Sequence, residues 1–172
     1  MVTGRECSGR RHAAGPTYHR CVTVDTIVTR EVDALPTAVV AARTTWQRFP
    51  REWPGLLDEV WACLRAGGVD HGCPNVMLYL DDTPRVEVGV WLRVPCELTG
   101  RVVRSHLPAG RVATTVHRGP FQDVGDAHQA VVDWCAANGE RPTGVRWEIY
   151  GPHRDDPAKL TTEVFWSLER RP

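Results

Sequence analysis

The sequence repeats itself once, and this internal duplication limits the folds that the chain can adopt. Residues 35–72, shifted by 72 positions, match residues 107–144 without gaps and give nine identical pairs. Roughly two or three would be expected by chance from composition. The pairs are Leu35/Leu107, Pro36/Pro108, Val40/Val112, Ala41/Ala113, Phe49/Phe121, Val60/Val132, Cys63/Cys135, Gly67/Gly139 and Gly72/Gly144. Two copies of so long a period exclude a solenoid and predict two similar halves related by a pseudo-twofold axis.

Each half reads as a strand, a helix and two further strands, preceded by an extended lead. Asp123 to Ala137 has apolar residues at helical spacing and is followed by Asn138-Gly139, which suits a helix end. The predicted strands are short and rich in β-branched and aromatic residues. In chain order the predicted elements are a lead Thr23 to Val32, a strand Thr37 to Trp46, a helix from about Pro54 to Ala66, strands Asn75 to Asp81 and Val86 to Val94, a lead Arg101 to Leu107, a strand Gly110 to His117, a helix Asp123 to Ala137, and strands Val145 to Gly151 and Thr161 to Leu168.

These elements predict an α+β domain of duplicated β-α-β-β modules, with two helices on one face of a largely antiparallel sheet. We expect the domain to span residues 21–172, with its first half at about 22–95 and its second at about 96–171. Residues 1–20 contain four arginines and no apolar core of a secretory signal, so we expect a flexible basic tail.

Charge and cysteine usage exclude several classes of function. The 21 Lys and Arg residues balance the 21 Asp and Glu residues, which argues against direct binding of nucleic acid. No apolar run is long enough to cross a membrane. The six cysteines show no paired spacing with each other or with histidine, so we expect no metal site, no cofactor and reduced thiols in a cytoplasmic protein.

Alternation along the strands predicts which side chains share a face of the sheet. Val86, Val88 and Val90 form one smooth apolar set, as do Val164, Trp166 and Leu168, and Trp147 shares a face with Ile149. We assign these sets to the face that the helices cover. The remaining positions mix glutamates with large aromatic residues, which predicts a concave, partly dry ligand cleft on the opposite face. The members of that mixed set are Met77, Tyr79, Glu87, Trp91, Glu148, Tyr150, Glu163 and Phe165.

Several motifs occur together from Leu107 onward: LPAGRVATTVHRGPF, a helix ending in DWCAANG, then WEIY and TTEVFW. In this combination and order they resemble the GyrI-like small-molecule-binding domain, which is also the effector-binding domain of AraC-type and MerR-type multidrug regulators. In the first half, VEVGVWLRVP is similar to the family's Val-Gly-Val strand. The resemblance covers about residues 22–171 and implies two β-α-β-β modules with a ligand held in the cleft between them.

The resemblance also implies that Glu148, in the Glu-x-Tyr strand, lies at the floor of this cleft and meets cationic aromatic ligands. A carboxylate among aromatic side chains loses hydration, and a bound cation favours its charged form. Its counterpart in the first half is Met77, so the cleft would hold its central carboxylate on one side only. The remaining predicted ligand-binding residues are Tyr79, Glu87, Trp91, Tyr150, Glu163 and Phe165, with Trp46 and Trp53 at the rim, where they could form a lid or cover the helix ends.

Three functions follow from this interpretation. The first is a stand-alone binder of hydrophobic or cationic aromatic small molecules, acting as a monomer or homodimer without contact to nucleic acid or membrane. The second is a hydrolase of cyclopropane-bearing natural products, in which Glu148 and Glu163 act as catalytic residues. The third is a gyrase-inhibitor-type protein partner, which a flat exposed glutamate face with no cavity would favour.

Overall fold

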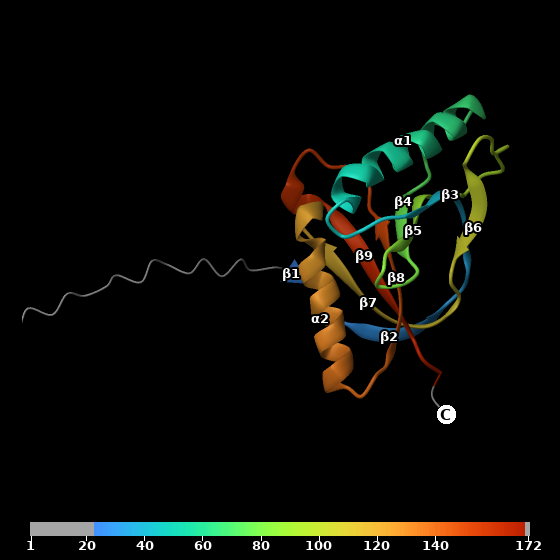
Figure 1. Ribbon diagram of the computed structural model, residues 1–172. Coiled ribbons are helices and arrows are strands. Elements are labelled where there is room, and N and C mark those ends of the chain that lie inside the picture. Colours follow the sequence, from blue (N-terminus) through green and yellow to red (C-terminus); the bar gives the residue numbers. More distant parts are fainter. Residues whose placement is uncertain (1–22, 171–172) are drawn as a thin grey trace, which may run out of the picture.

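The computed structural model describes residues 23–170, so the predicted tail at residues 1–20 lies outside the described part of the chain. Its elements alternate as the duplication predicts (Figure 1). They are β1 (Thr23–Val24), β2 (Val28–Val32), β3 (Leu35–Arg43), α1 (Phe49–Ala66), β4 (Asn75–Tyr79), β5 (Arg85–Trp91), β6 (Val103–Leu107), β7 (Gly110–Arg118), a short 3-10 turn (Phe121–Asp123), α2 (Val124–Ala137), β8 (Pro142–Tyr150), a second 3-10 turn (Pro157–Lys159) and β9 (Thr161–Leu168).

The strands form one antiparallel sheet whose two halves meet at a central seam. The strand order is β1-β7-β9-β8-β4-β5-β3-β6, with β2 also paired to β7. Strands β8 and β4 pair directly with each other at the seam. The order away from the seam is the same on both sides, since β8, β9 and β7 follow one another as β4, β5 and β3 do. The predicted α+β fold with pseudo-twofold duplication is therefore confirmed.

The two helices lie on the same face of the sheet and leave the seam between them. Helix α1 packs on β3 and β5, and α2 packs on β7 and β9 (Figure 1). Val60 and Leu64 of α1 are fully buried, as are Ala127, Val131 and Cys135 of α2. Because each helix covers an outer part of the sheet, the central strands β4 and β8 form the floor of a gap between them.

The opposite face of the sheet is filled by a second apolar core. Strand β2 leads the first half but pairs with β7, whereas β6 leads the second half but pairs with β3. Each half thus pairs its leading strand with the other half. This exchange folds the two ends of the sheet toward each other, and Leu35 of β3 pairs with Leu107 of β6. The enclosed core holds Trp147 stacked on Phe165, with ring centroids 5.2 Å apart. This core fills much of the face on which we expected the ligand cleft.

The repeat also matched the first strands in a register that the structure does not keep. Val40 packs against α1, whereas Val112, its match at an offset of 72, lies in the core on the opposite face.

Helix α1 begins at Phe49 rather than near Pro54 as predicted, so Pro54 lies inside the helix. Proline cannot donate to the carbonyl one turn earlier, which made Pro54 read as the first helical residue. Pro50 lies in the first turn instead, where a missing N–H costs nothing. Neither α-helix of residues 23–170 has an apolar stretch that could span a membrane.

Candidate ligand-binding cleft

A cavity of about 510 Å³ opens between the two helices, above the seam. Its floor comes from β4 and β8, one wall from α1, and the other wall from the segment that leads into α2. This volume lies in the range of small-molecule pockets. The lining residues are Phe49, Pro50, Trp53, Leu57, Asn75, Met77, Tyr79, Phe121, Gln122, Val124, Glu148, Tyr150, Gly151 and His153.

The strand register places Glu148 on the face that carries the helices. Glu148 lies opposite Met77 on β4 and opposite Val164 on β9, and directly paired residues share a face. Val88, whose set we correctly assigned to the helix-covered face, lies opposite Met77. Glu148 and Tyr150 therefore share the helix face with the valines, and the cleft opens there.

The Glu148 carboxylate is 2% exposed and accepts hydrogen bonds from three neutral side chains. The Tyr150 hydroxyl donates to Oε2, and the Tyr79 hydroxyl donates to Oε1 over 3.3 Å. Nε2 of His128 lies 2.8 Å from Oε1. No Lys or Arg side chain within the described residues forms an ion pair with this carboxylate.

The protonation of His128 follows from its second contact. The indole Nε1–H of Trp166 donates to His128 Nδ1 over 3.0 Å, and an indole N–H can only donate. Nδ1 must therefore offer its lone pair, which leaves the imidazole proton on Nε2, facing Glu148. His128 thus donates its Nε2–H to the Glu148 carboxylate.

Burial keeps both phenols in their donor form. Burial is the largest cause that raises the pKa of Tyr79 well above 10, and the nearby charge of Glu148 adds to it. The same two causes raise the pKa of Tyr150 well above its usual value. Both side chains therefore remain protonated and continue to donate to Glu148 at any pH near neutrality.

Aromatic rings line the cleft from both helices' sides. Phe49 of α1 meets Tyr79 edge-on at 5.7 Å, and Phe121 meets Tyr150 edge-on at 5.1 Å. Trp53 of α1 completes the wall. Aromatic rings that border a cavity beside a carboxylate suit flat ligands, and cations most of all.

The far end of the seam already holds a cation among aromatic rings. The Arg146 guanidinium lies 4.9 Å from the ring centroid of Trp166 and 5.3 Å from those of Tyr79 and Trp46. It forms an ion pair with Asp82 over 3.0 Å. Arg146 thus shares a face with Glu148 but is engaged elsewhere, and the seam stabilises positive charge by π contact.

Five predicted site residues meet in this cleft, and five do not. Met77, Tyr79, Glu148, Tyr150 and Trp53 line it. Trp46 lies outside, tilted against the Tyr79 ring at 5.7 Å, and it donates its indole N–H to the carbonyl of Asp82. The register places the other four on the opposite face of the sheet: Glu87, Trp91, Glu163 and Phe165.

Sequence patterns alone did not single out His128, and they placed Trp166 in the core. A signal for His128 was present, because it lies four residues after Val124 and three before Val131, on the sheet-facing stripe of α2. Arg146 carried the same kind of signal, since it precedes Glu148 by two positions and must share its face.

The architecture matches a known family. The model of the GyrI-like small molecule binding domain matches residues 26–169. This chain belongs to the GyrI-like family. No match is found among curated protein sequences.

Solved structures of low sequence identity share the fold. The EcmrR C-terminal domain is 18% identical, with a TM-score of 0.66 over 85% of this chain and 98% of that one. SAV2435 bound to tetraphenylphosphonium is 13% identical, with a TM-score of 0.60 over 84% and 94%. A hydrolase from Listeria innocua is 14% identical, with a TM-score of 0.52 over 84% and 92%.

The EcmrR chain in its complex with DNA is longer, and the match covers 58% of that chain and 85% of this one, with a TM-score of 0.65 at 19% identity. At these identities the likeness shows the fold alone.

Proposed function

We propose that this protein binds hydrophobic or cationic aromatic small molecules in the cleft above the seam, and so senses or sequesters them in the cytoplasm. The observation that carries the proposal is the Glu148 carboxylate, which is buried and bonded by neutral donors only. A buried charge without a counter-charge is costly, and a cationic ligand would supply that counter-charge. Cys63, Cys73, Cys96 and Cys135 are free thiols, as suits a reducing compartment.

The cleft walls support a flat ligand rather than a compact one. The rings of Trp53, Phe49 and Phe121 border the cavity. Aromatic rings can bind many flat cations, because stacking does not require one fixed orientation of the ligand. SAV2435, which shares the fold, was solved with the aromatic cation tetraphenylphosphonium. Binding of such a cation by this chain is our proposal.

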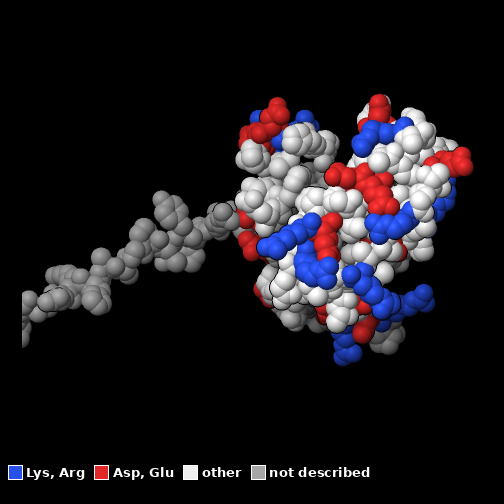
Figure 2. All heavy atoms as spheres, turned by 45° about the horizontal axis from the view of Figure 1, so that its top comes forward, with Lys and Arg blue, Asp and Glu red and all other residues white. Residues whose placement is uncertain are grey.

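The mixed charge of the surface favours recognition of a ligand's charge inside the cleft over long-range attraction. Figure 2 shows Lys, Arg, Asp and Glu side chains interspersed over one face, with no extended area of one sign. With equal numbers of basic and acidic residues in the chain, long-range steering of ligands is weak. Selection of a cation therefore depends on the Glu148 carboxylate that borders the cleft.

The two alternatives receive less support from the geometry. Paired-glutamate hydrolysis needs both carboxylates at one substrate, but Glu148 and Glu163 lie on opposite faces of adjacent strands. The protein-partner function was expected with an exposed glutamate face and no cavity, whereas Glu148 is buried beside a cavity of about 510 Å³.

Titration with tetraphenylphosphonium, followed by calorimetry, tests the proposal. Glu148→Gln keeps the shape but removes the charge, and we expect at least about tenfold weaker binding. Glu163→Gln removes the same charge from the other face of the neighbouring strand, so its affinity should stay within about twofold of wild type. Equal affinities for wild type and Glu148→Gln would contradict the proposal.

A further inference from the structure

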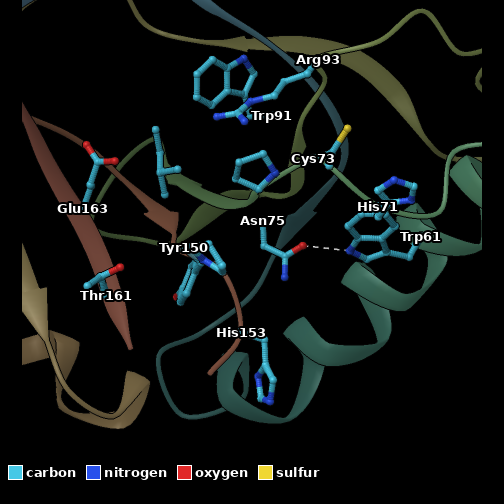
Figure 3. Close-up of a pocket in the computed structure, with 15 residues that line it drawn as sticks. Trp61, His71, Cys73, Asn75, Trp91, Arg93, Tyr150, His153, Thr161 and Glu163 are labelled. Carbon is cyan, nitrogen blue, oxygen red and sulfur yellow. Dashed lines mark hydrogen bonds between the residues drawn. The ribbon is translucent and has the colours of Figure 1, made fainter. Parts of the chain in front are cut away.

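A second cavity, of about 610 Å³, adjoins the Glu148 cleft at the end of the seam. It lies where β8 ends and β4 begins, and it extends to the last residues of β5 and the first of β9 (Figure 3). Asn75, Tyr150, Gly151 and His153 line both cavities. The two cavities therefore meet at these residues.

One unpaired cation lies on the wall of this second cavity. The Arg93 guanidinium lies over the Trp91 ring, 3.9 Å from its centroid. Figure 3 shows the two side chains together at the side of the cavity away from His153. No carboxylate in the described part of the chain pairs with Arg93. Stacking on the indole holds the guanidinium plane and leaves its N–H edge free for a planar anion.

The other charges of the cavity are already engaged. Glu163 lies 3.7 Å from Arg30, and His71 contacts Asp70. Among the Lys, Arg, Asp and Glu side chains that line this cavity, Arg93 alone forms no ion pair within residues 23–170, and its exposed guanidinium is free to meet a negative group on the ligand.

The junction between the cavities offers one oriented donor. The Trp61 indole N–H donates to Asn75 Oδ1 over 2.8 Å and so fixes which way the amide points. Figure 3 shows the Asn75 amide nitrogen directed away from Trp61. A carbonyl or ether oxygen on a ligand passing this point would accept a hydrogen bond from it.

We propose that the second cavity is a subsite for a carboxylate, and that the preferred ligands are elongated zwitterions. Their cationic aromatic body lies over Glu148, and an arm passes Asn75 and ends in a carboxylate at Arg93. The proposal rests on the function proposed above, because it needs the body of the ligand at Glu148.

Two matched series of phosphonium probes test this arrangement on the full chain. One series is triphenylphosphonium with carboxyalkyl arms of increasing length, and the other has alkyl arms of equal length that end in a methyl group. We expect the carboxylate series to bind about fivefold more tightly at the arm length that reaches Arg93, and equally at shorter lengths. Calorimetry gives both affinities.

Arg93→Gln should remove the carboxylate preference and leave binding of methyl-triphenylphosphonium unchanged. Arg43→Gln, an exposed arginine on β3, is the matched control and should keep the preference. Equal binding of the two series at every arm length, or a preference that persists in Arg93→Gln, overturns the subsite. Glu148→Gln should weaken the binding of methyl-triphenylphosphonium, which has no carboxylate arm. If this binding is unchanged in Glu148→Gln, the proposed cleft is wrong, whatever the result for the subsite.

Discussion

At the scale of single residues, the contact between Trp166 and His128 decides which imidazole nitrogen donates to Glu148. The indole N–H donates to Nδ1, so Nδ1 acts as the acceptor and the Nε2–H faces the Glu148 carboxylate. Trp166, which does not line the cleft, thus orients one of the three donors to this carboxylate.

Nitrogen-15 NMR of labelled histidine should therefore show the proton of His128 on Nε2, because the Trp166 indole N–H donates to Nδ1. A proton on Nδ1 would contradict this assignment.

The two buried phenols make the stability depend on alkaline pH. Above about pH 10 the tyrosines of the unfolded chain ionise, whereas burial and the Glu148 charge keep Tyr79 and Tyr150 protonated in the folded protein. The folded state then holds more protons, so the free energy of unfolding falls as the pH rises through this window, by about 1.4 kcal/mol per pH unit for each tyrosine. Tyr79→Phe should remove one such contribution. Urea unfolding between pH 9 and pH 11 gives the slope of the free energy of unfolding against pH for wild type and for Tyr79→Phe. Equal slopes would contradict a protonated Tyr79 in the folded protein.

At the scale of elements, helix α1 contains two residues that weaken it beside the cleft. Pro54 and Gly55 follow Trp53 directly, and both are exposed. A side chain at Gly55 would meet no atom within 4 Å. Gly55→Ala should therefore stabilise the protein by about 0.5–1 kcal/mol, because the unfolded chain loses conformational freedom. Gly72→Ala is the contrasting change. A side chain at Gly72 would also meet no atom within 4 Å, but its φ of +85° strains any residue with a Cβ, so Gly72→Ala should destabilise the protein. Urea unfolding compares the two, and loss of stability in Gly55→Ala would contradict the prediction.

Alternation predicted which residues of each strand share a face, but it could not decide which face. The apolar pairs Trp147/Ile149 and Val86/Val88 look alike in sequence, yet they lie on opposite faces. The deciding contact is the register between β4 and β8, which places Glu148 opposite Met77 across 71 residues of chain. Pairings between distant strands depend on the whole sheet, so local patterns predicted the elements but not that the cavity of about 510 Å³ opens on the face that carries the helices.

At the scale of the whole molecule, the exchanged strands make each half depend on the other. Strand β2 of the first half completes the edge beyond β7, and β6 of the second half completes the edge beyond β3. The seam between β4 and β8 also joins the halves, and its two sides supply the cleft floor. Duplication alone suggested two units, but the topology favours one cooperative structure.

Separately expressed halves, residues 22–95 and 96–171, should therefore fail to fold alone and should recover structure when mixed. Each half alone exposes the residues that it buries against the other, including Leu107 and the stacked pair Trp147 and Phe165. We expect circular dichroism of the isolated halves to show no cooperative unfolding, whereas the mixture should unfold cooperatively and bind tetraphenylphosphonium. A mixture containing Glu148→Gln in the second half is the control and should refold without binding. Binding of wild-type strength by the second half alone would show that α1 and β4 are not needed for the cleft, and would contradict a site shared between the halves.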